Sequence, residues 1–331
     1  MNEKDNKFLV MVKLKIDKTF NLERALVVKD KTPHSIDEFE NILRDLNCEV
    51  LTCLQSIRVR EVKTAIDIYN EVLKCWIDDL HSLIELTSPS ENLKEFMYTY
   101  VERFRVAEVL DAIREVSTDR LDERHYVLID INTLNLTPSR TVREFLEDLK
   151  SLYPRTYKIL SKVLMNYINS PLKELNLEVI EENVWRSFWS LLSSMTLKLR
   201  PHIKLRLVVN HLRDMELLEL LMRRAYLKGE DLSTYLSGKK PLVTNIISQV
   251  VQRSPIDFDT ALHIIKYAYS INELRYSPLS YDKALEYILA KEWEAHVVSH
   301  LIYILDNLGS EYLVKSIVSW WSWYEHVIKG T

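Results

Sequence analysis

Glycine is scarce in this chain, and its scarcity excludes several kinds of site. Only four of the 331 residues are glycine, whereas a typical protein has about 7%. Phosphate-binding loops, dinucleotide-binding turns and tight β-hairpins need glycine where φ is positive or where the backbone approaches a ligand. The glycines here are too far apart to build any of these: Gly229, Gly238, Gly309 and Gly330. The composition therefore argues against a nucleotide-binding α/β enzyme and favours a mostly helical protein.

The chain also lacks a strong charge imbalance, an even set of cysteines and a long apolar run. It has 44 basic and 48 acidic residues, a net charge of −4, so its overall charge does not indicate a nucleic-acid-binding protein. Cys48, Cys53 and Cys75 lack the spacing of a metal site, and we expect free thiols in a reducing compartment. The start of the chain is polar, and no apolar run reaches the about 18 residues that a membrane span needs. We therefore expect an intracellular protein that does not itself cross a bilayer.

Most of the chain shows the apolar spacing of amphipathic helices, with apolar residues at i, i+3, i+4 and i+7. Three long helices are predicted over residues 61–86, 91–116 and 178–199. Pro89 cannot continue the first of these, and Ser90 is placed to cap the second. Residues 9–16 and 126–136 alternate at period two instead, which leaves short strands and extended connectors as alternatives.

Two elements recur along the chain at nearly the same offset. Capping boxes, each a Ser or Thr with Glu three residues later, begin helices at Ser35 and Thr141, 106 residues apart. Residues 105–114 match residues 214–223, 109 positions later, and a weaker third copy lies at 294–303. Chance similarity between amphipathic helices is the alternative. We interpret the pattern as three related helical repeats, over residues 1–128, 129–230 and 231–331.

Two acidic or histidine pairs have partial metal-site spacing. Asp78 and Asp79 match the first half of a magnesium-binding aspartate motif, but no further acid follows one turn later, which favours solvated helix surface. His296 and His300 lie at i and i+4, a geometry that suits two metal ligands. Val297 stands where a metalloprotease has its catalytic glutamate, so we expect surface or buried structural histidines. A metal-dependent all-α enzyme is the least favoured hypothesis, and we predict no catalytic residues, no cofactor and no bound metal.

Basic side chains gather in one stretch of this slightly acidic protein. They alternate with apolar residues between Lys198 and Arg206, and further arginines follow. Such a local excess suits an acidic partner or anionic lipid headgroups, while a solvated face neutralised by nearby glutamates is the alternative. The candidate partner-binding residues are Arg200, Lys204, Arg206, Arg223 and Arg224.

The repeated helices share charged positions with a known family. These positions are Arg105, Arg114, Asp214, Arg223 and Glu294, and residues 287–294 read Tyr-Ile-Leu-Ala-Lys-Glu-Trp-Glu. In these features the chain resembles the C subunit of archaeal A-type ATP synthases, which is similar to the d subunit of vacuolar ATPases. Each repeat of that family ends in a helix with an acidic residue, an Asn-Leu pair and a later arginine. Here Arg105 takes the acidic place in the first copy, and the asparagine is replaced by Glu108, Leu217 and Val297.

The resemblance implies both a fold and a function. The fold is all-α, with three related repeats closed into a pseudo-threefold funnel on the cytoplasmic face of the membrane proteolipid ring. In proton transport and ATP synthesis, the funnel receives the central shaft and passes torque between shaft and ring, without binding nucleotide or catalysing a reaction itself. The expected partners are therefore the shaft subunits and the proteolipid ring, with no nucleic acid and no direct membrane insertion. The expected location is cytoplasmic, peripheral at the inner face of the cell membrane. The alternative is an all-helical scaffold or adaptor unrelated to rotary ATPases.

Overall fold

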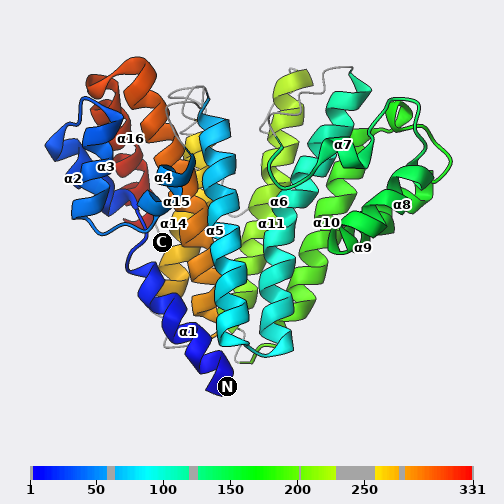
Figure 1. Ribbon diagram of the computed structural model, residues 1–331, viewed down its shortest axis with the longest axis horizontal. Helices are drawn as coiled ribbons and strands as arrows, with labels where there is room; N and C mark the ends of the chain where they lie inside the picture. Colours follow the sequence, from blue (N-terminus) through cyan, green and yellow to red (C-terminus); the bar gives the residue numbers. More distant parts are fainter. Residues whose placement is uncertain are drawn as a thin grey trace. The chain divides into compact units, whose positions relative to one another are not determined.

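The described part of the chain is mostly helical. The computed structural model describes residues 3–57, 64–118, 126–200, 203–228, 258–275 and 280–329. Within these ranges there is no β-strand, and the single β-type pairing is an isolated bridge between Thr141 and Pro171 (Figure 1). The predicted all-α class is therefore confirmed. Among the same residues, no helix combines the length and the apolar character that crossing a bilayer requires.

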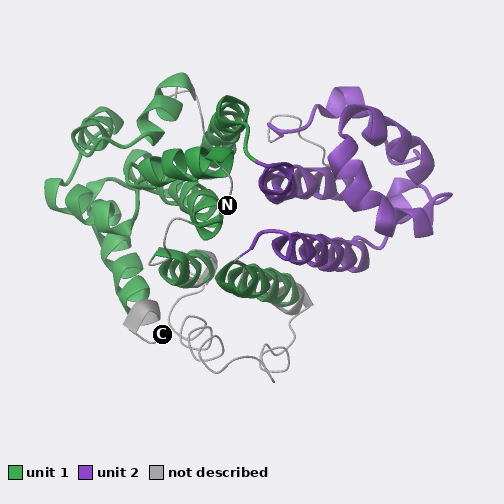
Figure 2. Ribbon diagram, turned by 90° about the horizontal axis from the view of Figure 1, so that it is seen from below, with its two compact units in different colours: residues 1–89, 201–331 green, residues 90–200 purple. Residues whose placement is uncertain are grey.

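Two compact units divide the chain (Figure 2). One comprises residues 1–89 and 201–331, and the other comprises residues 90–200. The first contains α1 (Glu3–Ile16), α2 (Leu22–Lys31), α3 (Ile36–Asp45), α4 (Val50–Ile57), α5 (Ala65–Thr87), α11 (Ile203–Lys228), α14 (Phe258–Arg275), α15 (Asp282–Leu308) and α16 (Ser310–Lys329). The second contains α6 (Glu91–Ser117), α7 (Ile131–Leu134), α8 (Val142–Leu152), α9 (Pro154–Leu164), the 3-10 turns η3 (Met165–Tyr167) and η4 (Leu172–Glu174), and α10 (Leu177–Thr196). A unit is defined by packing and a repeat by sequence similarity, so the repeat boundaries at 128/129 and 230/231 stay a prediction.

The order of short and long helices recurs along the chain. The short helices α3 and α4 are followed by the long helices α5 and α6, and the short α8 and α9 are followed by the long α10 and α11. The spacing is also kept, because α10 begins as far after α5 as α11 begins after α6. A third pair of long helices, α14 and α15, comes later in the chain. Residues 229–257, which precede this pair, lie outside the described part.

Within each unit, long helices from different parts of the chain pack against each other. In the unit of residues 90–200, α6 packs against α10. In the other unit, α11 packs against α14, and α15 packs against α5. We call α5 with α6, α10 with α11, and α14 with α15 the three sets of long helices. Each contact joins the second helix of one set to the first helix of the next, and the contact between α15 and α5 joins the last set to the first.

Helix α15 is the centre of the unit that contains both chain ends. Every residue from Asp282 to Ser299 is buried, because α1, α5, α14 and α16 all pack around this helix. A helix that is surrounded on all sides usually carries apolar residues, but α15 includes several charged ones. Since an unpaired buried charge is very costly, these side chains must find partners inside the unit.

The two predicted capping boxes are both recognisable. At the start of α8, the Thr141 hydroxyl accepts the Glu144 N–H (3.4 Å) and the Glu144 carboxylate accepts the Thr141 N–H (2.9 Å). At the start of α3, the Ser35 hydroxyl accepts the Glu38 N–H (3.2 Å). The Glu38 carboxylate there accepts the N–H of His34 (2.7 Å) instead of that of Ser35. The capping box at Thr141 is confirmed. At Ser35 only the bond to the serine hydroxyl is present, because the Glu38 carboxylate binds the N–H of the preceding residue, His34.

The two stretches with period-two alternation are not strands. Residues 9–16 belong to α1, which buries Phe8, Leu9 and Val12 at helical spacing and leaves Val10 and Leu14 exposed. The alternation was misleading because Val10 and Leu14, which are exposed on the outer side of α1, occupy every second position together with Val12. In the other stretch, residues 126–130 form a non-helical connector with bends, and residues 131–134 form the short helix α7, so neither predicted alternative holds for the whole of 126–136.

Candidate functional site

Three charged positions of the predicted repeats lie near the middle of long helices. Arg105 is on α6, Asp214 on α11 and Glu294 on α15. Arg105 is half-buried and pairs with the buried Glu102 (2.8 Å), while its Nε donates to the main-chain oxygen of Leu128 (3.1 Å). It therefore ties α6 to the connector that leads into α7.

Glu108, one turn further along α6, binds the same connector. Its carboxylate accepts three consecutive main-chain N–H groups, from Val127 (3.2 Å), Leu128 (2.9 Å) and Ile129 (3.1 Å). Burial raises the pKa of Glu108 to about 7, although these three N–H groups act in the opposite direction. An asparagine oxygen could perform the same acceptor role at this position.

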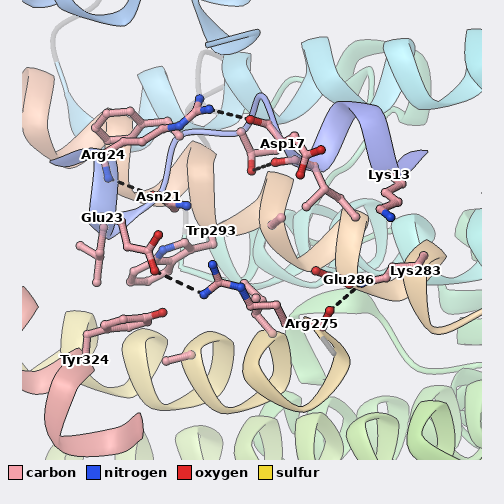
Figure 3. Close-up of a pocket in the computed structure, with 17 residues that line it drawn as sticks. Lys13, Asp17, Asn21, Glu23, Arg24, Arg275, Lys283, Glu286, Trp293 and Tyr324 are labelled. Atoms are coloured by element: carbon pink, nitrogen blue, oxygen red, sulfur yellow. Dashed lines mark hydrogen bonds and ion pairs between the residues drawn. The ribbon is translucent and has the colours of Figure 1, made fainter. Parts of the chain in front are cut away.

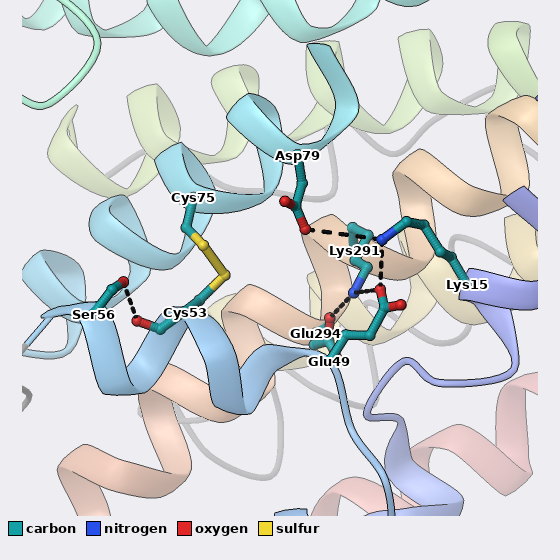
Figure 4. Close-up of a disulfide and its surroundings, with 8 residues drawn as sticks. All are labelled: Lys15, Glu49, Cys53, Ser56, Cys75, Asp79, Lys291 and Glu294. Atoms are coloured by element: carbon teal, nitrogen blue, oxygen red, sulfur yellow. Dashed lines mark hydrogen bonds and ion pairs between the residues drawn. A yellow bond between two sulfur atoms is a disulfide. The ribbon is translucent and has the colours of Figure 1, made fainter. Parts of the chain in front are cut away.

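Glu294 has an equivalent role on α15 (Figure 4). It is buried, pairs with Lys291 (2.8 Å) and accepts the main-chain N–H of Phe20, in the loop between α1 and α2. Lys291 also lies 3.5 Å from Glu49, which pairs with Lys15 on α1 (3.1 Å). Burial raises the pKa of Glu294, and the positive charge of Lys291 opposes that rise. This network satisfies the buried charges at the centre of α15.

The remaining repeat positions differ in their surroundings. Asp214 is exposed and pairs with its neighbour Arg213 (2.9 Å). Arg114 is half-buried and joins α6 to α10 through Glu181 (2.9 Å). The backbone of Arg223 is part of α11, but its side chain lies outside the described residues. Three of the repeat positions thus make contacts inside their own unit: Arg105, Arg114 and Glu294. Sequence similarity alone could not distinguish such positions from partner-binding ones.

The predicted partner-binding residues are exposed where the structure describes them. Lys204 and Arg206 lie near the start of α11, and Arg200 lies just before it, at the end of the other compact unit. Lys204 donates to the main-chain oxygen of Glu273 (3.3 Å), and among the described residues none of the three cations lies within ion-pair distance of a carboxylate. Their positive charge is therefore available at the surface. The side chains of Arg223 and Arg224 lie outside the described residues.

Exposed apolar side chains accompany these cations on α11. Ile203 is 80% exposed and Leu207 is 43% exposed. They lie four positions apart, so they are neighbours on one side of the helix. Apolar residues beside unpaired cations are typical of a surface that contacts a partner. The sequence analysis considered only the charges of this stretch.

The two weaker metal-site candidates lie in different surroundings. Asp78 and Asp79 are exposed, and Asp79 lies 3.9 Å from Lys15. His296 is buried, with its ring stacked on that of His263 (4.1 Å between centroids) and tilted against that of His300 (4.2 Å). Burial, with a smaller contribution from His263, lowers the pKa of His296 well below its usual value. In the described ranges, no group of three or more potential ligand side chains is arranged to hold a metal ion.

One expectation about the cysteines was wrong. Cys53 on α4 and Cys75 on α5 form a disulfide, with their Cα atoms 5.8 Å apart, while Cys48 is a buried free thiol (Figure 4). The spacing of the cysteines in the sequence could not reveal this pairing, because it depends on how α4 packs against α5. The expectation of a reducing compartment depended on free thiols and loses that support.

Sequence reasoning also missed a cavity of about 460 Å³ in the unit that contains α15 (Figure 3). Its lining comes from α1, α2, α14, α15 and α16, so no single stretch of sequence marks it. Its charged lining residues on α1 and α2, such as Lys13 and Arg24, are equally typical of a solvated helix and gave no distinct signal in the sequence.

Comparisons with family models, with curated proteins and with solved structures find no match to this chain.

Proposed function

We propose that this chain is a non-catalytic central-stalk subunit of a rotary A/V-type ATPase, a socket between the central shaft and the membrane proteolipid ring. In this role it transmits torque during proton transport coupled to ATP chemistry. It acts as a peripheral protein on the cytoplasmic face of the membrane, and its basic surface meets acidic groups of the ring or the shaft.

The pairing of long helices from successive sets is the observation that carries the proposal. Helix α6 packs on α10, α11 on α14, and α15 on α5, so each set of long helices is continued by the next and the last returns to the first. Three such sets are what a pseudo-threefold funnel requires. An adaptor built from stacked repeats would instead leave its first and last repeats without mutual contact.

The anchoring contacts support the same arrangement. Glu108 on α6 binds the connector before the second set, and Glu294 on α15 binds the loop before α2. In both places the second long helix of one set fixes the backbone that leads into the short helices of a set. These contacts favour a stiff structure, as does the scarcity of glycine, and torque transmission needs stiffness.

The surface of α11 supports a protein partner that carries acidic groups. Lys204 and Arg206 supply the positive charge, and Ile203 and Leu207 supply apolar contact area. Interfaces commonly combine these two components, with charges that select the partner and apolar groups that exclude water.

Affinity purification of the full chain from native membranes tests the proposed function. We expect the shaft subunits and the proteolipid to be recovered together with the chain. Recovery of other partners without any ATPase subunit would contradict the proposal and favour the adaptor alternative.

Charge reversal tests the proposed surface separately. The triple variant Arg200→Glu, Lys204→Glu and Arg206→Glu should lose most of the co-purifying ATPase subunits, because favourable charge pairs become repulsive. The matched control is Lys158→Glu, Lys162→Glu and Lys173→Glu, which reverses three exposed lysines elsewhere and should retain the complex. If the parent recovers the complex and both triple variants do so equally, the proposed surface is wrong while the function stands.

A further inference from the structure

The cavity beside α15 has the size of a small-molecule site. Its volume is about 460 Å³, within the range of typical ligand pockets. Its walls are the end of α1, the loop to α2, the start of α2, and parts of α14, α15 and α16 (Figure 3). All of these elements belong to one compact unit, so the cavity is defined without reference to the other unit.

Part of the lining is apolar and comes from two long helices. Helix α14 contributes Ala268 and Ile271, and helix α15 contributes Ala290 and Trp293. Ala268, Ala290 and Trp293 are buried, and the adjoining helices hold them in place. An indole beside small side chains is suited to an apolar or aromatic group of a ligand.

Two of the carboxylates that line the cavity are already neutralised. Glu286 on α15 pairs with Lys283 (2.6 Å), and both are buried. Glu23 at the start of α2 pairs with Arg275 at the end of α14 (3.3 Å), and Figure 3 shows both pairs at the cavity. These four side chains add no net charge.

The other charged side chains leave an excess of positive charge. They are Lys13, Asp17 and Arg24, from α1, the following loop and α2. The Arg24 guanidinium donates to the main-chain oxygen of Asp17 (2.6 Å) and to the sulfur of Cys48 (3.1 Å). Among the described residues, neither Arg24 nor Lys13 lies within ion-pair distance of a carboxylate. The remaining lining thus holds two cations and one carboxylate, and arginine is well suited to bind an oxyanion through paired N–H groups.

We propose that this cavity binds a small organic anion. The carboxylate or phosphate oxygens of the ligand pair with Lys13 and Arg24, and its apolar body packs against Trp293. The basis is the juxtaposition of unpaired cations from α1 and α2 with the apolar lining from α14 and α15. The proposal does not depend on the proposed role in a rotary ATPase.

Calorimetric titration of the full chain tests the ligand class. Phenylacetate and phenyl phosphate serve as the two anionic probes, and they distinguish a carboxylate site from a phosphate site. We expect at least one of them to bind at millimolar concentration or below. The neutral isostere phenylacetamide and inorganic phosphate should each bind at least about tenfold more weakly than the better probe, since each lacks one of the two interactions.

Two variants locate the binding. Lys13→Gln and Arg24→Gln should each weaken the better probe about tenfold, the effect of losing one charge-assisted hydrogen bond. The matched control Lys29→Gln removes a cation of α2 that does not line the cavity and should not change the affinity. Lys13 is exposed, so its variant tests the site even if Arg24→Gln affects folding. The proposal is overturned if neither anion binds, or if Lys13→Gln binds as tightly as the parent.

Discussion

Glu108 and Glu294 show how single carboxylates connect one part of a unit to the next. Each projects from a long helix and accepts main-chain N–H groups from a non-helical segment: Val127 to Ile129 for Glu108, and Phe20 for Glu294. Both segments lead into short helices. At this scale the chemical requirement is an acceptor at the right place on the long helix.

The pKa of Glu108 makes a prediction about pH. Because the pKa is raised from 4.5 to about 7 in the folded chain, the folded state binds this proton more tightly than the unfolded state. The contribution of Glu108 to stability is therefore present below the unfolded pKa and is lost as the pH rises towards about 7. The variant Glu108→Gln does not titrate, so its free energy of unfolding should fall less between about pH 5 and about pH 8.

Urea unfolding of the parent and the variant at both pH values measures this difference. Glu147→Gln is the control, because Glu147 is an exposed residue of α8 and its removal should leave the pH profile of the parent intact. If the free energy of unfolding of Glu108→Gln depends on pH as that of the parent does, the pKa of Glu108 is not raised in the folded chain.

Glu294 makes a prediction about stability. Replacing it with alanine leaves Lys291 buried with only the more distant Glu49 (3.5 Å) and leaves the Phe20 N–H without its acceptor. Breaking a buried ion pair from one side costs about 3–5 kcal/mol, so Glu294→Ala should lower the free energy of unfolding by about that amount. Glu311→Ala breaks an exposed pair with Lys315 and should change it very little. Equal effects of the two variants would mean that Glu294 is not the buried anchor described here.

At the scale of the elements, the helix ends show how the chain manages with so little glycine. Gly309 ends α15 with φ of 85°, but elsewhere residues with side chains adopt positive φ: Thr32, Asn47, Ser88 and Asn135. Asparagine tolerates this conformation well, whereas a β-branched threonine does not. The scarcity of glycine thus brings a local cost at Thr32, the C-cap of α2.

Thr32→Gly should therefore stabilise the chain. Relief of the left-handed conformation exceeds the added entropy of the unfolded chain, for a net gain of about 0.5–1 kcal/mol. Thr52→Gly, at an exposed position within α4, is the matched control and should destabilise by about 0.5 kcal/mol because glycine is a poor helix former. Thermal unfolding of both variants measures these changes in stability. A loss of stability in Thr32→Gly would contradict the predicted backbone strain at Thr32.

The disulfide between α4 and α5 gives a prediction at the same scale. Cys53 and Cys75 are 22 residues apart, and closing a loop of that length stabilises the folded state by about 3 kcal/mol in the chain-entropy model. Dithiothreitol should therefore lower the stability of the parent. The double variant Cys53→Ala and Cys75→Ala, which keeps Cys48, should not respond to the reductant. A response of equal size in both chains would show that the disulfide is not the cause.

Helices could be predicted from the sequence more reliably than the contacts between them. Long helices and the capping boxes at Ser35 and Thr141 were foreseen, because apolar spacing and capping are local properties. The disulfide, the stacking of His296 on His263 and the cavity beside Trp293 were not foreseen. Each of them brings together side chains of different helices, and no local pattern encodes which side chains meet.

At the scale of the whole chain, the recurring order of short and long helices is more informative than any single residue. The repeat positions Arg105 and Asp214 have different charges and different surroundings, yet α6 and α11 hold the same place in their sets. The helix order and the pairing of long helices therefore recur although the individual side chains differ. They are the basis of the proposed role as a socket between shaft and ring.

The most direct test of that role is a measurement of coupling. Inverted membrane vesicles from cells that lack this chain should show little ATP-driven proton pumping, because the shaft and the ring are then disconnected. Adding the purified chain back should restore pumping, and the variant with Arg200, Lys204 and Arg206 reversed to glutamate should restore it less. Vesicles that pump protons normally without the chain would contradict the account.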